Sequence, residues 1–184
     1  MPFRYRGSRR ELAVAQFVRR HYALVQNNHH ISSDEFHRLV QPLVGLPVSR
    51  AWRGYGSAAF LELGKLTEVY ERTKRPKGEA GVMIQWSWRV ESARAIVVGS
   101  WCGDRKITHG VEALAGRKIE GISLVGRLPE VSIRLSGGRW LHSFMTADGQ
   151  PTWSVFLPDG SWLCVRRGYV VREHPKKREQ KNAA

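Results

Sequence analysis

Apolar and polar residues alternate in several separate stretches after residue 43, and this period of two constrains the fold more than any other feature. The stretch AAFLELG begins at residue 58, and EVSIRLSGG begins at residue 130. Successive side chains of a strand point to opposite faces of a sheet, so each stretch predicts a strand with one buried face. The C-terminal part of the chain is therefore expected to be rich in antiparallel strands.

Further stretches extend this pattern at the spacing of hairpins. Residues 82–90 alternate without a break and predict one continuous strand, preceded by a loop over 70–81. Pro158-Asp159-Gly160 separates two apolar runs, which is typical of a hairpin turn. We count about eight or nine strands, as in a sandwich or an open barrel.

Two helices are expected before the strands. Residues 8–28 have an apolar period of 3.6 and a basic opposite face. Ser32 and Glu35 have capping-box spacing and predict a second, short helix that ends before Pro42. The predicted fold class is mainly β (α+β). The predicted domains are a helical segment over 1–42, a β-rich domain over 43–171 and a disordered basic tail over 172–184.

A short phrase occurs twice in the chain. Leu43-Val44-Gly45 returns as Leu114-Ala115-Gly116, and an alternating strand follows each copy. The glycines indicate a positive φ angle or a close backbone approach. We interpret the echo as scaffold: two imperfect copies of one unit, over 43–100 and 114–166. Coincidence between two β-rich stretches is the alternative.

The net charge of +14 is the strongest functional signal. Residues 1–30 carry +5 and residues 172–184 carry +3, so the two ends hold more than half of it. A positive field attracts nucleic acid, acidic proteins or anionic lipid. No apolar run approaches the ~20 residues of a membrane span, and no membrane role is expected. The alternative is a solvated surface in an arginine-rich protein, since 22 of the 30 basic residues are arginines. That bias suggests a GC-rich bacterial genome.

Nucleic-acid binding would use basic side chains for phosphates and tryptophans for stacking on bases. The expected stacking residues are Trp52, Trp86 and Trp88, although cross-strand packing in the core is the plainer explanation for them. The expected phosphate-binding residues are Arg9, Arg10, Arg19, Arg20, Arg72, Lys74, Arg75, Lys77, Lys176, Lys177 and Arg178.

Catalysis has one candidate, in the stretch SWCGDRKITHG. Cys102, Asp104 and His109 could form a thiol nucleophile with a base and an orienting acid. A short loop that turns a corner of the chain, with Gly103-Asp104 as the turn, is the commoner explanation of such a stretch. The pair His29-His30 with His37 lacks the ligand spacing of a zinc site, so no metal and no cofactor are expected.

The sequence therefore predicts a cytoplasmic, non-catalytic bacterial protein with reduced thiols, whose basic surface binds an anionic macromolecule. Nucleic acid, bound by an accessory factor, is the first expectation. A protein-interaction module, antitoxin-like or a complex subunit with an acidic partner, is the alternative. A thiol-dependent enzyme around Cys102 and His109 is the third.

Overall fold

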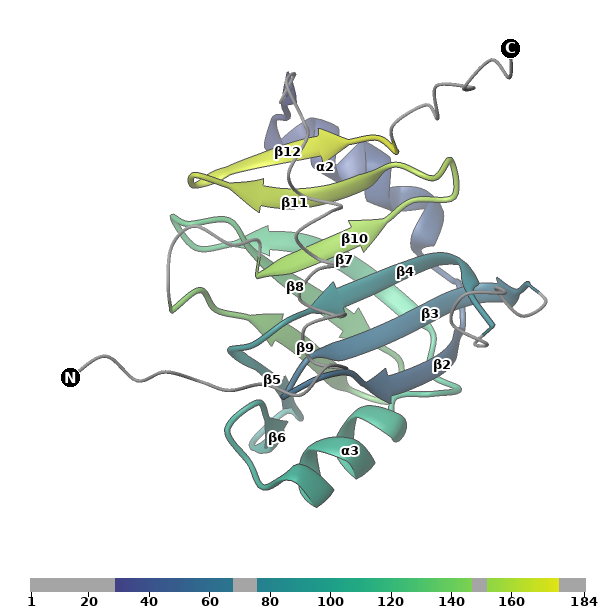
Figure 1. Cartoon of the computed structure of the whole chain (residues 1–184), viewed down its shortest axis with the longest axis vertical. Helices are drawn as coiled ribbons and strands as arrows, with labels where there is room; N and C mark the ends of the chain where they lie inside the picture. The colour runs from purple at the N-terminus through teal and green to yellow at the C-terminus, as the bar shows by residue number, and fades with distance from the viewer. Residues whose placement is uncertain (1–28, 68–75, 147–151, 176–184) are drawn as a thin grey trace, which may run out of the picture.

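The computed structural model describes residues 29–67, 76–146 and 152–175, and their fold is two antiparallel sheets with two short helices. Figure 1 shows the two sheets as layers, with one helix behind the upper strands and the other at the bottom. The sheets do not close into a barrel, and the predicted mainly β fold with a sandwich of antiparallel sheets fits roughly. In the described part of the chain no helix is long and apolar enough to cross a membrane.

The seven-stranded sheet has the order β1-β12-β11-β10-β4-β3-β2, and the five-stranded sheet has the order β6-β5-β9-β8-β7. The helices are α2 (Ser33–Val40) and α3 (Asp104–Glu112), and a 3-10 turn η1 (Gln41–Leu43) follows α2. The strands are β1 (His29–His30), β2 (Val48–Arg53), β3 (Ala59–Leu66), β4 (Gly78–Ile84), β5 (Trp88–Glu91), β6 (Ile96–Gly99), β7 (Ile119–Val125), β8 (Glu130–Leu135), β9 (Arg139–Ser143), β10 (Trp153–Phe156), β11 (Trp162–Arg166) and β12 (Tyr169–Glu173).

The main core lies between the sheets and is built from the inward residues of the alternating strands. Leu61 and Leu63 on β3 and Ile133 and Leu135 on β8 are all at most 1% exposed. A second, smaller cluster of Trp162, Cys164, Val171 and Phe156 packs separately from this core. Because these residues alternate with the inward ones on β10, β11 and β12, the second cluster lies on the outer face of the seven-stranded sheet.

Each echoed phrase is hydrogen-bonded to the start of the other half's first strand. The N–H of Gly45 donates to the carbonyl of Ile119, and the N–H of Gly116 donates to the carbonyl of Val48, both at 2.8 Å. The two bonds correspond at an offset of 71 residues. Both glycines have a positive φ, +92° and +83°, which confirms the conformation expected for them.

The same correspondence extends through both halves. The indole N–H of Trp88 donates to the carbonyl of Ser57 at 2.6 Å, and that of Trp153 donates to the carbonyl of Pro129 at 2.9 Å. Both tryptophans are completely buried. The hairpin β5–β6 follows β4 but joins the sheet of β9, while β10–β11 follows β9 but joins the sheet of β4. Each half therefore lends its last hairpin to the other half's sheet.

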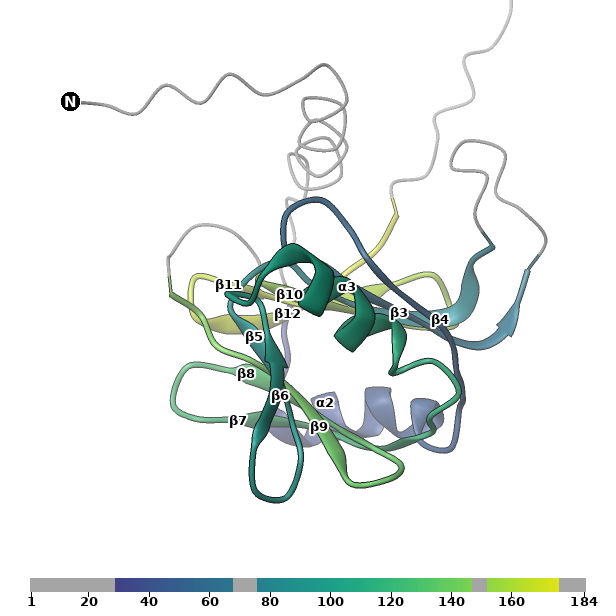
Figure 2. The same cartoon turned by 90° about the horizontal axis from the view of Figure 1, so that it is seen from below.

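The two helices also occupy equivalent positions in the two halves. α2 begins at Ser33 and α3 begins at Asp104, again 71 residues apart. Each helix lies against the first strand of the opposite half, α2 on β7 and α3 on β2. Figure 2, seen from below, shows α3 over one end of the space between the sheets and α2 behind it.

Several expectations need correction. The stretch 82–90 is two strands in different sheets, because Ser87 has a φ of +56° and turns the chain between them. The predicted loop over 70–81 includes the start of β4 at Gly78. The stretch from Asp104 to Glu112 begins where a loop was predicted, and it forms the helix α3. β12 runs to Glu173 and so includes the first two residues of the predicted tail, and Glu173 is 1% exposed.

The predicted cap at the start of the short helix α2 is confirmed. The side chain of Ser32 accepts a hydrogen bond from the N–H of Glu35 at 3.1 Å, and α2 ends at Val40, before Pro42. The predicted helix over 8–28 lies outside the described residues.

Candidate interaction site

Most of the predicted phosphate-binding residues lie outside the described residues. Only Lys77 is described, and it is exposed immediately before β4. The described residues carry a net charge of +6, so +8 lies in the remaining segments. The predicted residues outside the description are Arg9, Arg10, Arg19, Arg20, Arg72, Lys74, Arg75, Lys176, Lys177 and Arg178.

The three predicted stacking residues are not brought together. Trp88 is completely buried in the core, so its ring presents no surface to a base, and the plainer explanation applies to it. Trp52 is half-buried on β2 and stacks on Phe60, with ring centroids 4.1 Å apart. Trp86 is half-buried in the link between β4 and β5.

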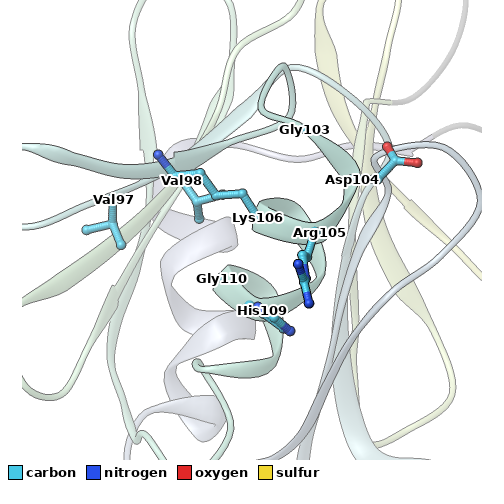
Figure 3. Close-up of a pocket in the computed structure, with 8 residues that line it drawn as sticks. All are labelled: Val97, Val98, Gly103, Asp104, Arg105, Lys106, His109 and Gly110. Atoms are coloured by element: carbon cyan, nitrogen blue, oxygen red, sulfur yellow. The ribbon is translucent and has the colours of Figure 1, made fainter.

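The candidate thiol site is not assembled as a triad. Arg53 on β2 donates to the Asp104 carboxylate at 2.8 Å. Asp104 and His109 are five residues apart on α3, roughly 140° around its axis, and so point in different directions (Figure 3). Cys102 is half-buried ahead of the helix. Burial raises the pKa of the other thiol, Cys164, well above its ordinary range, so that residue is a core filler.

The described histidines do not belong to any group of side chains that could hold a metal ion. Among the described residues no group of three or more His, Cys, Asp or Glu side chains could hold a metal ion. The ring of His30 stacks on Tyr169 of β12, with centroids 4.5 Å apart. His37 packs edge-on against Phe36 of α2.

An exposed apolar corner lies where β6 leads into α3. Trp101 is 85% exposed, and Ile96 and Val97 on β6 are 63% and 38% exposed. A buried tryptophan stabilises a core, but an exposed one beside exposed aliphatic residues is typical of an interaction surface. We name Trp101, Ile96 and Val97 with the adjacent basic residues Arg105 and Lys106 the β6–α3 corner.

A groove of about 660 Å³ runs through this corner between β6 and the first two turns of α3. Figure 3 shows Lys106 reaching from α3 toward Val98, while Asp104 and His109 point in different directions. α3 lies very close to the strand, because a Cβ added at Gly110 would sit 2.5 Å from Val98 Cγ1. The groove is shallow and open, and its lining is mostly apolar with Arg105, Lys106 and Asp104 as its charged residues. With a single carboxylate it contains no carboxylate pair for acid–base catalysis.

The first turn of α3 carries mixed charge. The N-terminus of a helix is positive and favours acidic side chains, as at Asp34 and Glu35 in the first turn of α2. Asp104, the first residue of α3, is acidic, but the positions equivalent to Asp34 and Glu35, 71 residues later, are Arg105 and Lys106. The N-cap residue of α3, Gly103, provides no side-chain cap. Arg105 and Lys106 therefore lie where a positive charge is unfavourable.

The outer face of the five-stranded sheet, beside the corner, carries a small charged cluster. Arg89 and His142 both contact Glu91, and the Arg89 guanidinium also lies 5.5 Å from the Phe144 ring centre. The hydrogen bond from Arg89 is the main cause that lowers the pKa of Glu91. Burial lowers the pKa of His142, against the attraction of Glu91. This cluster leaves Arg89 and Glu91 neutralised by one another.

Sequence reasoning missed the β6–α3 corner. Trp101 stands outside the alternating strands, and its exposure follows only from the turn between β6 and α3. The signal that was present is the echo itself, which extends upstream from Leu114 and predicts a helix with a basic first turn. No protein family, curated protein or solved structure matches this chain.

Proposed function

We propose that this chain is a non-catalytic interaction module whose β6–α3 corner binds an acidic region of a partner protein. The observation that carries the proposal is the 85% exposed Trp101, flanked by exposed Ile96 and Val97 and by Arg105 and Lys106. Aromatic anchors with a charged rim are typical of protein interfaces.

The charge balance favours an acidic partner. Among the described acidic residues near the corner, Asp104 is paired with Arg53 and Glu91 with Arg89. Arg105 and Lys106 form no ion pair with another described residue, so their charge is available to an anionic surface. Complementary charge would speed association and exclude basic partners.

A site-specific crosslinker tests this proposal inside the cell. Trp101→benzoylphenylalanine places a photoreactive group at the centre of the corner. The matched control places it at Leu128, which is 53% exposed in the turn between β7 and β8. A crosslinked acidic protein obtained from position 101 and absent from position 128 would support the proposal. Products that are the same at both positions, or none at all, would reject it.

Nucleic-acid binding remains a second candidate, favoured by the +8 that lies outside the described residues. Fluorescence anisotropy of labelled single-stranded DNA, duplex DNA and RNA across a salt series tests it. Binding through about four or more phosphates would give a log–log salt slope near −3 or steeper. Binding that is weak and equal for all three probes near physiological salt would remove this candidate.

We also propose that the two halves descend from one duplicated unit. The hydrogen bonds shared at an offset of 71 and the reciprocal exchange of hairpins support it. Residues 101–175 expressed alone should then form a two-fold dimer that exchanges β10–β11, measurable by light scattering. A folded monomer would argue against a symmetric ancestor.

A further inference from the structure

We propose that β6 accepts an antiparallel strand from its acidic partner, in the position that β12 occupies on β11. This inference rests on the proposed function and specifies how the partner binds. β11 has β10 on one side and β12 on the other, whereas β6 has β5 on one side and ends the five-stranded sheet. The two strands are equivalent, since Val90 pairs with Val98 as Val155 pairs with Leu163.

The backbone of β6 presents free hydrogen-bonding groups at this edge. The N–H of Ser100 donates to the carbonyl of Trp88 at 2.9 Å, so Ser100 faces β5. Backbone groups alternate in direction along a regular strand, so Val98 also faces β5 and Gly99 faces outward, while Val97 lies at the register shift and has no partner on β5. Strand addition uses such a row of groups for affinity and side-chain pockets for specificity.

The equivalent groups on β11 already bind a strand. Cys164, equivalent to Gly99, pairs with Val171, and Trp162, equivalent to Val97, pairs with Glu173. The molecule therefore contains, in its other half, the arrangement that we propose for β6.

The edge of β6 is only partly protected among the described residues. Open edges are usually shortened, bulged, charged or covered. β6 has four residues, and its pairing with β5 shifts register between Val90 and Glu91, as the edge strands β2 and β7 also shift. Unlike the two-residue edge strand β1, however, β6 exposes Ile96 and Val97, and it contains neither a proline nor a charge.

The charges at the two ends of β6 specify an acidic strand. Arg94 is exposed in the turn before β6, and Arg105 and Lys106 follow it on α3. A second copy of this chain is the wrong occupant, because an antiparallel pair of β6 strands would bring Arg94 of one copy toward Arg105 and Lys106 of the other. Like charges placed together at an interface are unfavourable. An extended segment that alternates apolar and acidic residues matches both the edge and its rim.

Synthetic peptides test strand addition directly on the full chain. The probe is an eight-residue peptide of alternating Glu and Val with blocked ends. The first control replaces each Glu with Lys. The second control is the Glu–Val peptide N-methylated on alternate amides, which keeps the charge and removes one hydrogen-bonding edge. Amide chemical shifts and hydrogen exchange at Val97 and Gly99 report binding at β6.

We expect the Glu–Val peptide to bind and to slow exchange at Val97 and Gly99, and both controls to bind at least about tenfold more weakly. R105Q/K106Q should reduce the affinity at least about fivefold, whereas R38Q on the exposed face of α2 should leave it unchanged.

Three results would overturn the inference. Equal binding of the N-methylated peptide, lost in R105Q/K106Q, would leave an acidic partner but exclude strand addition. Binding of none of the peptides would exclude strand addition, while the crosslink at position 101 decides separately on the partner. Protection of Val97 and Gly99 without peptide, together with a dimeric mass, would make a second copy the occupant.

Discussion

The charge at the start of α3 leads to a prediction in which loss of function accompanies a gain in stability. Arg105 and Lys106 are exposed in the first turn of α3, next to the positive end of its dipole. R105Q/K106Q removes both charges and keeps long side chains with good helix propensity. A single charge near a helix end changes stability by about 0.3–1 kcal/mol at low ionic strength. The double variant should therefore be more stable by ~0.6–2 kcal/mol.

Urea unfolding at low ionic strength measures this gain, and thermal unfolding confirms it. For a protein of this size, each kcal/mol raises Tm by about 2–4 °C. The gain should shrink in 1 M salt, where the Debye length falls to ~3 Å. The same variant should bind the Glu–Val peptide less tightly.

The other helix provides a control of opposite sign. Arg38 lies in the last turn of α2, where a positive charge is favourable, so R38Q should lower stability by ~0.3–1 kcal/mol. If R105Q/K106Q also lowered stability, the two side chains would be making stabilising contacts. That result would refute binding as the reason why Arg105 and Lys106 are retained.

Three further predictions concern the scaffold. W88F and W153F each remove the donor to a carbonyl in the core, so each should cost ~2–4 kcal/mol in urea unfolding, and a large difference between them would contradict their equivalence. G110A should cost ~1–3 kcal/mol in the same assay, because its Cβ would meet Val98. Burial lowers the pKa of His142, so its neutral form stabilises the fold above the ordinary value near ~6.5, and stability should fall as pH drops below that value. H142Q should flatten this pH dependence between pH 8 and 5, and an unchanged slope would place its cause elsewhere.

The strands were predictable because burial imposes a period of two. Leu61, Leu63, Ile133 and Leu135 alternate with polar residues, and all four are in the core. The same rule failed over 82–90, since a chain can keep the alternation while changing sheets. The break depends on the backbone of Ser87, and serine has no intrinsic preference for a positive φ.

α3 was missed because its local signals are weak. It has a glycine at 110, no side-chain cap, and two basic residues beside Asp104 in its first turn. Ile107, Val111 and Leu114 have helix spacing and are all buried. Phe36, Val40 and Leu43 occupy the equivalent positions in the other half, so comparing the halves further upstream would have identified the helix.

The β6–α3 corner depends on contacts far apart in the sequence. Nothing local indicates that β6 ends its sheet, because the pairing of β5 with β9 is decided by residues some 50 positions later. Trp101 is one of seven tryptophans in the chain, and its exposure separates it from buried Trp88 and Trp153 only after folding.

Equivalent halves give this molecule an internal reference for what the fold requires. Positions that match, such as Gly45 with Gly116, are needed for the shared hydrogen bonds. Positions that differ are not required by the architecture, because the other half folds without them. Two differences lie close together: Arg105 and Lys106 of α3 replace Asp34 and Glu35 of α2, and β6 ends its sheet where the equivalent β11 is covered by β12. Selection for stability would favour the α2 charges in both halves. On the proposed function, the place where β6 of the first half meets α3 of the second is therefore the part of the molecule that is adapted to bind.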